Sequence, residues 1–352
     1  MHVNIVGLPA ALAVAQWQRA SGREFLCALV AGCDLMCRIG ASVALPHRGF
    51  AYTSVAGALG SAAASARLLG LDAIATRHAL GLAYLQAAGT QQANIEPTLA
   101  KRLLAAFPAR AGILAARLAQ QGLTAPAEIF EGAFGFYALY QPGDPDRLLH
   151  RLGEVFESDA LSIKRFPSCG CNHTAIEATL QLMARHQLLP DQVESIEVTV
   201  SPYIDRIVGG RYDPTDDPQV AAQFSIRYSV ACALVRRRLG LAEIEADAAR
   251  DPAINAQVPK VSVRIEPTWT GGRGPVRVRM KTPHLGVIEQ QVDDVPGSDA
   301  SPLTQAQIDE KFDECFGRGV RPLSGTQQKT LRARVAGIDQ LDDLRGLFDD
   351  LG

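Results

Sequence analysis

Residues 56–69 read AGALGSAAASARLL, and this run of small residues decides the fold class of the first part of the chain. Gly57, Gly60 and Ser61 stand among alanines, so the helix that this run predicts has few protruding side chains. Neighbouring backbones can approach such a helix closely, which favours a buried position in a large bundle over a surface position. A nucleotide-binding loop would need Gly-x-Gly-x-x-Gly after a strand, and this run has neither feature.

The rest of the chain falls into three regions of different pattern. Up to about residue 150 and again after residue 300 the apolar residues recur with helical spacing, whereas the middle region mixes strands and helices. Helices are expected over 8–15, 24–35, 174–186, 222–238, 303–316 and 324–351, and strands over 193–200, 261–265 and 276–281. We therefore expect a mainly α protein with an α+β part: a helical domain built from residues 1–150 and 300–352, and a smaller α+β lid domain over 151–299.

Composition limits the classes of function. The 352 residues carry 47% apolar and 20% charged residues, which is enough for two domains with buried cores. The formal net charge is −2, and no basic block is interleaved with aromatic residues, so we expect no nucleic-acid partner. Seven scattered cysteines and the lack of a signal-peptide pattern indicate a reducing cytoplasm. Charged residues interrupt the apolar helices, so no membrane span is expected.

Residues 164–173, KRFPSCGCNH, form the stretch with the clearest chemistry. Lys164 supplies a cation, and Ser168, Cys169 and Gly170 offer a hydroxyl and backbone amides just before a predicted helix, whose N-terminus also attracts anions. Such a stretch can bind a carboxylate. The alternative is a tight turn with a capping side chain and an ordinary surface lysine, and both interpretations can hold together.

The end of this stretch raises the question of a metal. Cys169, Cys171 and His173 resemble the start of a zinc site, but no second ligand pair with suitable spacing occurs elsewhere, and structural zinc normally has four protein ligands. We expect neither a metal nor an iron–sulfur cluster, and no other cofactor. His173 is either a general acid/base or a residue that orients the loop, and its place at the helix start favours the orienting role.

Several segments, in the same order along nearly the whole chain, resemble the MmgE/PrpD family, whose members include 2-methylcitrate dehydratase, cis-aconitate decarboxylase and iminodisuccinate epimerase. Each segment alone is a weak match, but six in the correct order are a strong one. The resemblance implies a large helical domain made from both chain ends, capped by an α+β domain, in agreement with the breaks in composition. The matching segments are LPAALA (8–13), residues 57–72, AKRL (100–103) with ARAG (109–112), LTAP (123–126) with EG (131–132), IKRFPSC (163–169) with HTAIEA (173–178), and DP (213–214) with AQFSIRY (222–228).

The resemblance also implies roles for single residues. Lys101 and Lys164 would hold carboxylates and stabilise the negative charge that grows on a substrate during dehydration or decarboxylation. A lysine beside another cation can also act as a base. Tyr228 would donate its phenol to a substrate oxygen, or else is a core residue with a satisfied hydroxyl. His2 falls at the histidine of the family's His-Pro segment, and we count it among the candidates for proton transfer.

Departures from the family pattern concern the acid/base residues. Ala51 and Leu104 stand where the family usually has histidines, and His47 is a candidate substitute for the missing imidazole. Family members usually begin with several further helices that carry an Asp-Asp-x-x-His segment, and these helices precede the part that matches here. Apolar helix faces that they would cover predict self-association, and the family resemblance points to a homodimer.

Three functional expectations follow. The first is a cofactor-independent lyase or isomerase acting on a small di- or tricarboxylate, in first place a 2-methylcitrate dehydratase-like hydro-lyase of propionate metabolism, with decarboxylation or epimerisation as the other reactions. The second is a relative that binds carboxylates without turnover, because of Ala51 and Leu104. The third is an incomplete product of a longer gene. Sequence alone leaves the substrate and the direction of the reaction open.

Overall fold

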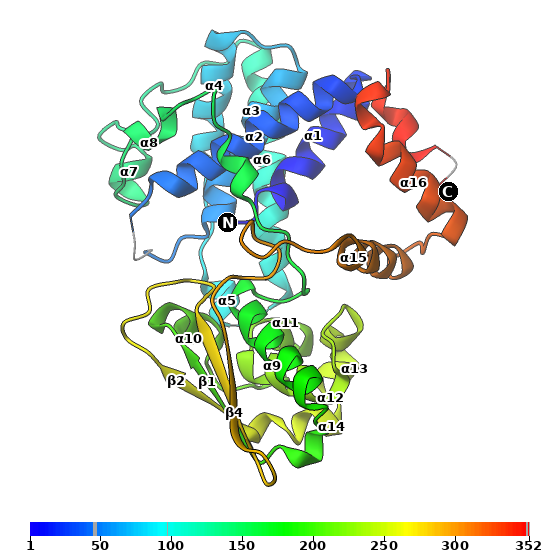
Figure 1. Cartoon of the computed structure of the whole chain (residues 1–352). Coiled ribbons are helices and arrows are strands. Elements are labelled where there is room, and N and C mark those ends of the chain that lie inside the picture. Colours follow the sequence, from blue (N-terminus) through cyan, green and yellow to red (C-terminus); the bar gives the residue numbers. More distant parts are fainter. Residues whose placement is uncertain (45–47, 97, 350, 352) are drawn as a thin grey trace. The chain divides into compact units, whose positions relative to one another are not determined.

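The computed structural model describes residues 1–44, 48–96, 98–349 and 351, and the chain forms two compact units (Figure 1). The first, here called the helical unit, comprises Met1–Ala93, Ala100–Asp159 and Leu323–Gly352. The second, here called the α+β unit, comprises Asn94–Leu99 and Ala160–Pro322. The expected mainly α fold with an α+β part is confirmed. The chain passes from the helical unit to the α+β unit after Asp159 and returns after Pro322. Both boundaries lie later in the chain than those expected near residues 150 and 300.

The helical unit is built around four long helices, α1, α2, α3 and α6, of which α3 and α1 each contact the other three. Figure 1 shows them in blue to cyan. The elements of this unit are α1 (Asn4–Gln18), α2 (Gly22–Ser42), α3 (Tyr52–Leu68), α4 (Ala73–Tyr84), η1 (Leu99–Arg102), α6 (Leu103–Gln120), α7 (Phe136–Leu139), α8 (Asp146–Leu149), η2 (Glu157–Ala160), α16 (Gly325–Ala336), η7 (Ile338–Gln340) and η8 (Leu344–Phe348). The short helix α5 (Gln92–Ile95) and η1 each cross between the two units.

Glycines let the central helix α3 approach its neighbours as closely as its small residues predict. A Cβ atom on Gly32 of α2 would lie 2.5 Å from the carbonyl oxygen of Gly60. A Cβ atom on Gly112 of α6 would lie 2.4 Å from the Cβ atom of Ser61 and 2.5 Å from the amide nitrogen of Ala62. Ordinary carbon contacts are roughly 3.5–4.0 Å, so these two helix pairs have no room for a side chain at these glycines.

Helix α2 is long and apolar enough, by length and composition, to cross a membrane, and it alone among the described helices passes that test. It also carries Asp34 and Arg38, which are 5% and 2% exposed. Half of its most apolar stretch is buried within the structure, and it contacts α1 and α3. These features are those of a core helix of the helical unit.

The α+β unit holds a four-stranded sheet with helices. Its strands are β1 (Ser195–Val200), β2 (Val261–Ile265), β3 (Val276–Thr282) and β4 (Gly286–Val292). Its helices are η3 (Gly170–Asn172), α9 (His173–His186), η4 (Pro190–Gln192), α10 (Pro202–Val208), α11 (Pro218–Gln223), α12 (Ile226–Arg236), η5 (Ala242–Ile244), α13 (Ala246–Ala249), α14 (Pro252–Asn255), η6 (Val258–Lys260) and α15 (Gln305–Gly317).

The strand order is β2-β1-β3-β4, with β1 parallel to β2 and antiparallel to β3, and β3 antiparallel to β4. Ile196, Val198 and Val200 of β1 are fully buried, and α9 contacts β3 and β4 while α12 contacts α9 and β2. Charged residues such as Glu197 and Arg279 lie on the strands between the buried ones. The three strands expected from alternating residues are therefore present, and β4 is an additional strand that pairs with β3 along its whole length.

Two expected helices are interrupted. The one expected over 324–351 ends at Ala336, the last residue of α16, and η7 and η8 follow it. Residues 222–238 were expected to form a single helix, but α11 ends at Gln223 and α12 begins at Ile226. Ser225 has an extended backbone, and its side-chain oxygen accepts a hydrogen bond from the amide of Tyr228 at 3.1 Å. The serine acts as an N-cap, which competes with a continuous helix because it satisfies an amide at the start of a new one.

Candidate functional site

Residues 164–173, here called the anion loop, form a folded turn that leads into α9. The Nζ atom of Lys164 donates to the carbonyl oxygen of Ser168 at 2.8 Å. The amide of Cys169 donates to the carbonyl oxygen of Gln223, the last residue of α11, at 2.9 Å. The side-chain amide of Asn172 donates to the same oxygen at 3.1 Å. The loop is thus held from within by its lysine and from outside by α11.

His173 lies beneath the loop as its first α-helical residue and is 1% exposed. Its ring packs edge-on against Phe166, with ring centres 5.3 Å apart. Burial, followed by the positive charge of Lys164, lowers the pKa of His173 to about 3, and hydrogen bonds to backbone at Ser168 and Phe166 oppose this shift without cancelling it. The imidazole is therefore neutral at physiological pH. Of its two expected roles, this enclosure favours orienting the loop.

The anion loop presents backbone amides at one point. The amides of Gly170 and Cys171, the first two of η3, have no acceptor among the residues that the structure describes. The amide of Cys169, which was expected to contribute, is occupied by Gln223, and Ser168 is 4% exposed. Free amides at the start of a helix are a favourable place for an anion. Gly170 and Cys171 are thus the amides that remain for a carboxylate.

The two cysteines of the loop are thiols in an enclosed setting. The Sγ atom of Cys171 donates to the carbonyl oxygen of Gly272 at 3.2 Å. A hydrogen bond with Cys169 and burial raise the pKa of Cys171 well above the usual value. A thiol that resists deprotonation is a poor metal ligand, because metals bind the thiolate. Among the described residues, no three His, Cys, Asp or Glu side chains are placed to hold a metal ion.

Arg273 joins this site although sequence reasoning passed over it. It belongs to the loop Gly271-Gly272-Arg273-Gly274-Pro275 between β2 and β3. The hydroxyl of Thr174, in the first turn of α9, donates to the carbonyl oxygen of Arg273 at 2.8 Å. A Cβ atom on Gly170 would lie 3.8 Å from the Nε atom of Arg273. A single arginine among glycines between two strands was the signal that could have identified it.

Tyr228 is a core residue with a satisfied hydroxyl, which is the second of its two expected roles. It is fully buried, and its hydroxyl donates to the backbone carbonyl of Glu243. Its ring lies tilted against Tyr212, with centres 4.9 Å apart. Burial raises the pKa of Tyr228 strongly. A phenol enclosed in the core and already bonded to backbone is not available to a substrate, so the structure does not bring Tyr228 into the site.

Lys101 and His2 belong to the helical unit. Lys101 is half-buried in η1, directly before α6. The backbone amide of His2 donates to the hydroxyl oxygen of Thr53 at 3.1 Å, and its Nδ1 atom lies 3.5 Å from the same oxygen. His2 is therefore anchored beside the first turn of α3. His47 lies outside the described residues.

The two positions expected to carry histidines meet in the helical unit. The amide of Ala51 donates to the carbonyl oxygen of Gly89 at 3.1 Å. A Cβ atom on Gly89 would lie 3.5 Å from a side-chain carbon of Leu104, and the hydroxyl of Ser54 donates to the carbonyl oxygen of Leu104 at 2.6 Å. Ala51 and Leu104 thus lie around one glycine, a few residues from Thr53 and Lys101. Where two imidazoles are expected, this chain has an apolar patch.

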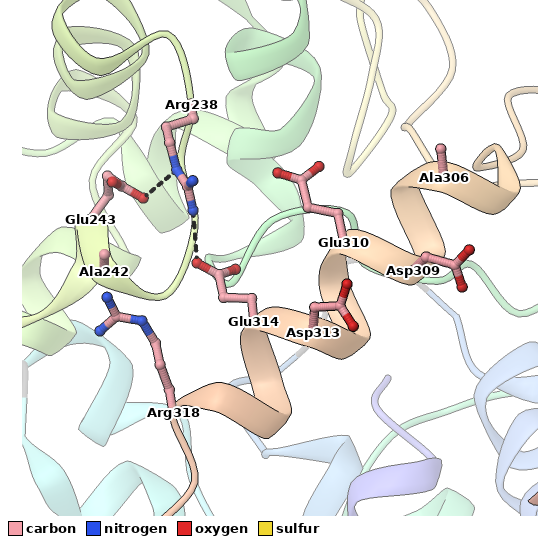
Figure 2. Close-up of a pocket in the computed structure, with 9 residues that line it drawn as sticks. All are labelled: Arg238, Ala242, Glu243, Ala306, Asp309, Glu310, Asp313, Glu314 and Arg318. Carbon is pink, nitrogen blue, oxygen red and sulfur yellow. Dashed lines mark hydrogen bonds and ion pairs between the residues drawn. The ribbon is translucent and has the colours of Figure 1, made fainter. Parts of the chain in front are cut away.

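An open pocket of about 700 Å³ lies elsewhere in the α+β unit, between η5 and α15. Figure 2 shows Arg238 between Glu243 and Glu314, with Asp309, Glu310 and Asp313 along the helix. The ion pairs of Arg238 with Glu243 and Glu314 measure 3.1 and 2.9 Å. Five carboxylates against the guanidinium groups of Arg238 and Arg318 make the lining acidic. It repels a polycarboxylate, and none of the expected site residues lines it. This pocket is therefore not a candidate for a carboxylate site, and the anion loop remains the candidate.

Comparison with known proteins settles the family. The model of the MmgE/PrpD N-terminal domain matches residues 1–148, and that of the MmgE/PrpD C-terminal domain matches residues 166–335. The chain belongs to the MmgE/PrpD family. The family expected from the sequence is confirmed.

The names of three curated relatives of this MmgE/PrpD chain refer to cis-aconitate decarboxylase. A cis-aconitate decarboxylase-like protein, oryM, of Aspergillus oryzae is 30% identical over 285 residues, which cover 74% of this chain and 59% of the relative. Cis-aconitate decarboxylase of Aspergillus terreus is 26% identical over 69% of this chain and 54% of its own length. The Homo sapiens cis-aconitate decarboxylase is 27% identical over 85% and 62%. The chain therefore spans less than two thirds of the length of these relatives.

Proposed function

We propose that the chain is a cofactor-independent lyase of the MmgE/PrpD type that acts on a small di- or tricarboxylate. The observation that carries the proposal is the anion loop: Lys164, the free amides of Gly170 and Cys171, and the start of α9 lie within one short turn. Such groups stabilise a carboxylate because they are fixed before the substrate arrives. The names of the relatives support the same substrate class.

Removal of carbon dioxide or water from a polycarboxylate places negative charge on the carbon next to a carboxylate, and this charge spreads onto the carboxylate oxygens. Cations and amides that contact these oxygens stabilise the transition state more than the substrate, which is the condition for catalysis. In this proposal Lys164 and Lys101 hold carboxylates. His173 positions the anion loop from beneath, because its imidazole is enclosed and neutral.

Proton transfer is assigned to the helical unit. His2, exposed and held beside Thr53, and Lys101 are the two residues of that unit that we propose for proton transfer.

Decarboxylation of cis-aconitate is the first reaction to assay, because three relatives carry that name. Dehydration of 2-methylcitrate, the reaction expected first from the sequence, and epimerisation of iminodisuccinate are the other two. The free thiols at Cys27 and Cys315 on the surface agree with a proposed cytoplasmic location.

A second candidate function is carboxylate binding without turnover. The observation that favours it is the apolar pair Ala51 and Leu104 around Gly89, where acid/base residues were expected. The two candidates share the anion loop and differ only in the chemical step.

The test is turnover of purified protein with each of the three substrates, followed by Lys164→Met and Lys101→Met. Loss of one charged contact in the transition state is expected to lower kcat/KM by about 10- to 150-fold. Lys281→Met is the matched control, because Lys281 lies exposed on β3 and pairs with Glu194 at 2.9 Å. If both variants keep the wild-type kcat/KM, the proposed lyase site is wrong. If wild-type protein binds a tricarboxylate without turning any substrate over, the binding function takes its place.

A further inference from the structure

The loop that carries Arg273 is fixed by three separate elements of the α+β unit. The hydroxyl of Ser201 donates to the carbonyl oxygen of Gly271 at 2.6 Å. Cys171 of the anion loop donates to Gly272 at 3.2 Å, and Thr174 of α9 donates to Arg273 at 2.8 Å. Three consecutive carbonyls are therefore anchored, and two of the anchors come from the anion loop and the helix that follows it. A loop with this many anchors holds its arginine in a defined place.

The guanidinium group of Arg273 lies against the anion loop without a carboxylate partner among the described residues. Its side chain passes Gly170, where an added Cβ atom would be 3.8 Å from both the Cδ and Nε atoms. Its Nη1 atom donates to the hydroxyl of Ser162 at 3.3 Å. Arg165, by contrast, pairs with Glu177, and Arg238 pairs with Glu243 and Glu314.

Two unpartnered polar atoms lie at the same point of the fold. The Nε2 atom of His173 and the Oδ1 atom of Asn172 are buried and have no hydrogen-bond partner in the described part of the chain. His173 is 1% exposed and Asn172 is fully buried. The free amides of Gly170 and Cys171 beside them are donors that a carboxylate can satisfy, whereas the Oδ1 atom of Asn172 is an acceptor and needs a donor such as water or a substrate hydroxyl. Buried groups left without partners are uncommon unless a ligand or water satisfies them.

We propose that Arg273 binds a carboxylate of the substrate, together with the amides of Gly170 and Cys171, and thereby selects tricarboxylates over dicarboxylates. The inference rests on the proposed function and adds a specificity-determining residue to it. Lys164 is a point charge that can hold one carboxylate from any direction, whereas the planar guanidinium fork of Arg273 matches the two oxygens of a carboxylate. Lys164 and Arg273 both belong to the α+β unit. This unit alone can therefore bind two carboxylates of one substrate.

Arg273→Gln removes the charge and the fork, and Arg273→Lys keeps only the charge. We expect Arg273→Gln to raise the KM for a tricarboxylate about 10- to 100-fold with a smaller change in kcat, because this contact is made in both the substrate complex and the transition state. Arg273→Lys should recover part of the loss. The loss of binding should be smaller for a dicarboxylate such as glutarate, which lacks the third carboxylate of tricarballylate.

The matched control is Arg264→Gln. Arg264 is exposed on β2, and its ion pair with Glu197 is long, at 3.9 Å. Two measurements are made on each protein: turnover of cis-aconitate, and calorimetric binding of tricarballylate, a tricarboxylate that cannot undergo elimination. A thermal melt confirms that the variants fold as wild type does.

The outcomes separate the inference from the proposed function. Turnover with an unchanged KM in Arg273→Gln overturns the inference and leaves the lyase standing. Binding of tricarballylate that weakens in Arg273→Gln, without any turnover, supports the inference and overturns the lyase. Neither turnover nor binding in the wild-type protein overturns both.

Discussion

The buried ion pair of α2 provides the sharpest test of how the helical unit is held together. The Nε atom of Arg38 donates to the Oδ2 atom of Asp34 at 2.6 Å, and the two residues are 2% and 5% exposed. Arg38 also donates to the carbonyl oxygens of Leu148 at 3.2 Å, His150 at 2.9 Å and Val155. One side chain therefore fixes a whole segment between α8 and η2 against α2.

Arg38→Met replaces the guanidinium group with an apolar side chain of similar length. It leaves the Asp34 carboxylate without its cation and removes the donor from three carbonyls. Removal of one partner from a buried pair costs about 3–5 kcal/mol, and each carbonyl left without a donor adds up to roughly 1 kcal/mol where water cannot replace it. We expect the free energy of unfolding to fall by about 3–5 kcal/mol if water replaces the donor at the three carbonyls, and by up to about 8 kcal/mol if it does not.

Urea denaturation followed by far-UV circular dichroism measures this change. Arg151→Met is the matched control, because Arg151 and Glu154 form an exposed pair at 3.2 Å and such pairs contribute less than about 1 kcal/mol. Adding Asp34→Asn to Arg38→Met should restore part of the loss, since the uncompensated charge is then gone. A loss below about 1 kcal/mol in Arg38→Met would refute the reasoning, because it would mean that water or movement replaces the buried contacts.

Three further predictions concern packing, pH and association. Gly112→Ala should lower the free energy of unfolding by about 1–3 kcal/mol in urea denaturation, since its Cβ atom would lie 2.4 Å from that of Ser61, whereas Gly325→Ala, with no atom within 4 Å of its Cβ position, should leave it unchanged or raise it. The pKa of His173 is lowered to about 3 in the fold and is near 6.5 when unfolded, so its contribution to stability is full above pH 6.5 and is lost as the pH falls towards 3; His173→Gln should flatten this part of the stability profile measured by thermal melts, and an unchanged profile would contradict the assignment. Light scattering should give a mass above that of the monomer, and Phe107→Glu on α6, where Phe107 is 55% exposed, should reduce it; a strictly monomeric wild type would count against the expected homodimer.

Local sequence patterns predicted most of the helices and strands, because the spacing of apolar and small residues along the chain reflects which face of an element is buried. Alternating apolar residues marked β1, β2 and β3, and the run of small residues marked α3 as a helix in close contact with its neighbours. Strand β4 was missed because its residues are largely exposed or half-buried and it is defined by pairing with β3. The break between α11 and α12 was missed because a single serine cap decided it.

The candidate site was likewise predicted only in part from the sequence. Its anion loop was visible in the sequence, because a lysine, a turn and a helix start follow one another within ten residues. Arg273 was not, because about a hundred residues separate it from the loop, and only the contacts of Thr174 and Cys171 bring it there. Tyr228 stood in a matching segment, yet its burial against Tyr212 removes it from the site.

The sequence by itself determined the family, the mainly α fold with its α+β part, and the loop that can bind an anion, because each can be recognised from patterns within short segments and from the order of these segments along the chain. The tertiary structure alone decided which amides of that loop remain free, that His173 is neutral, and that Arg273 rather than Tyr228 lies beside it. These properties depend on burial and on partners far away in the chain. Desolvation and long-range contacts arise only when the chain has folded.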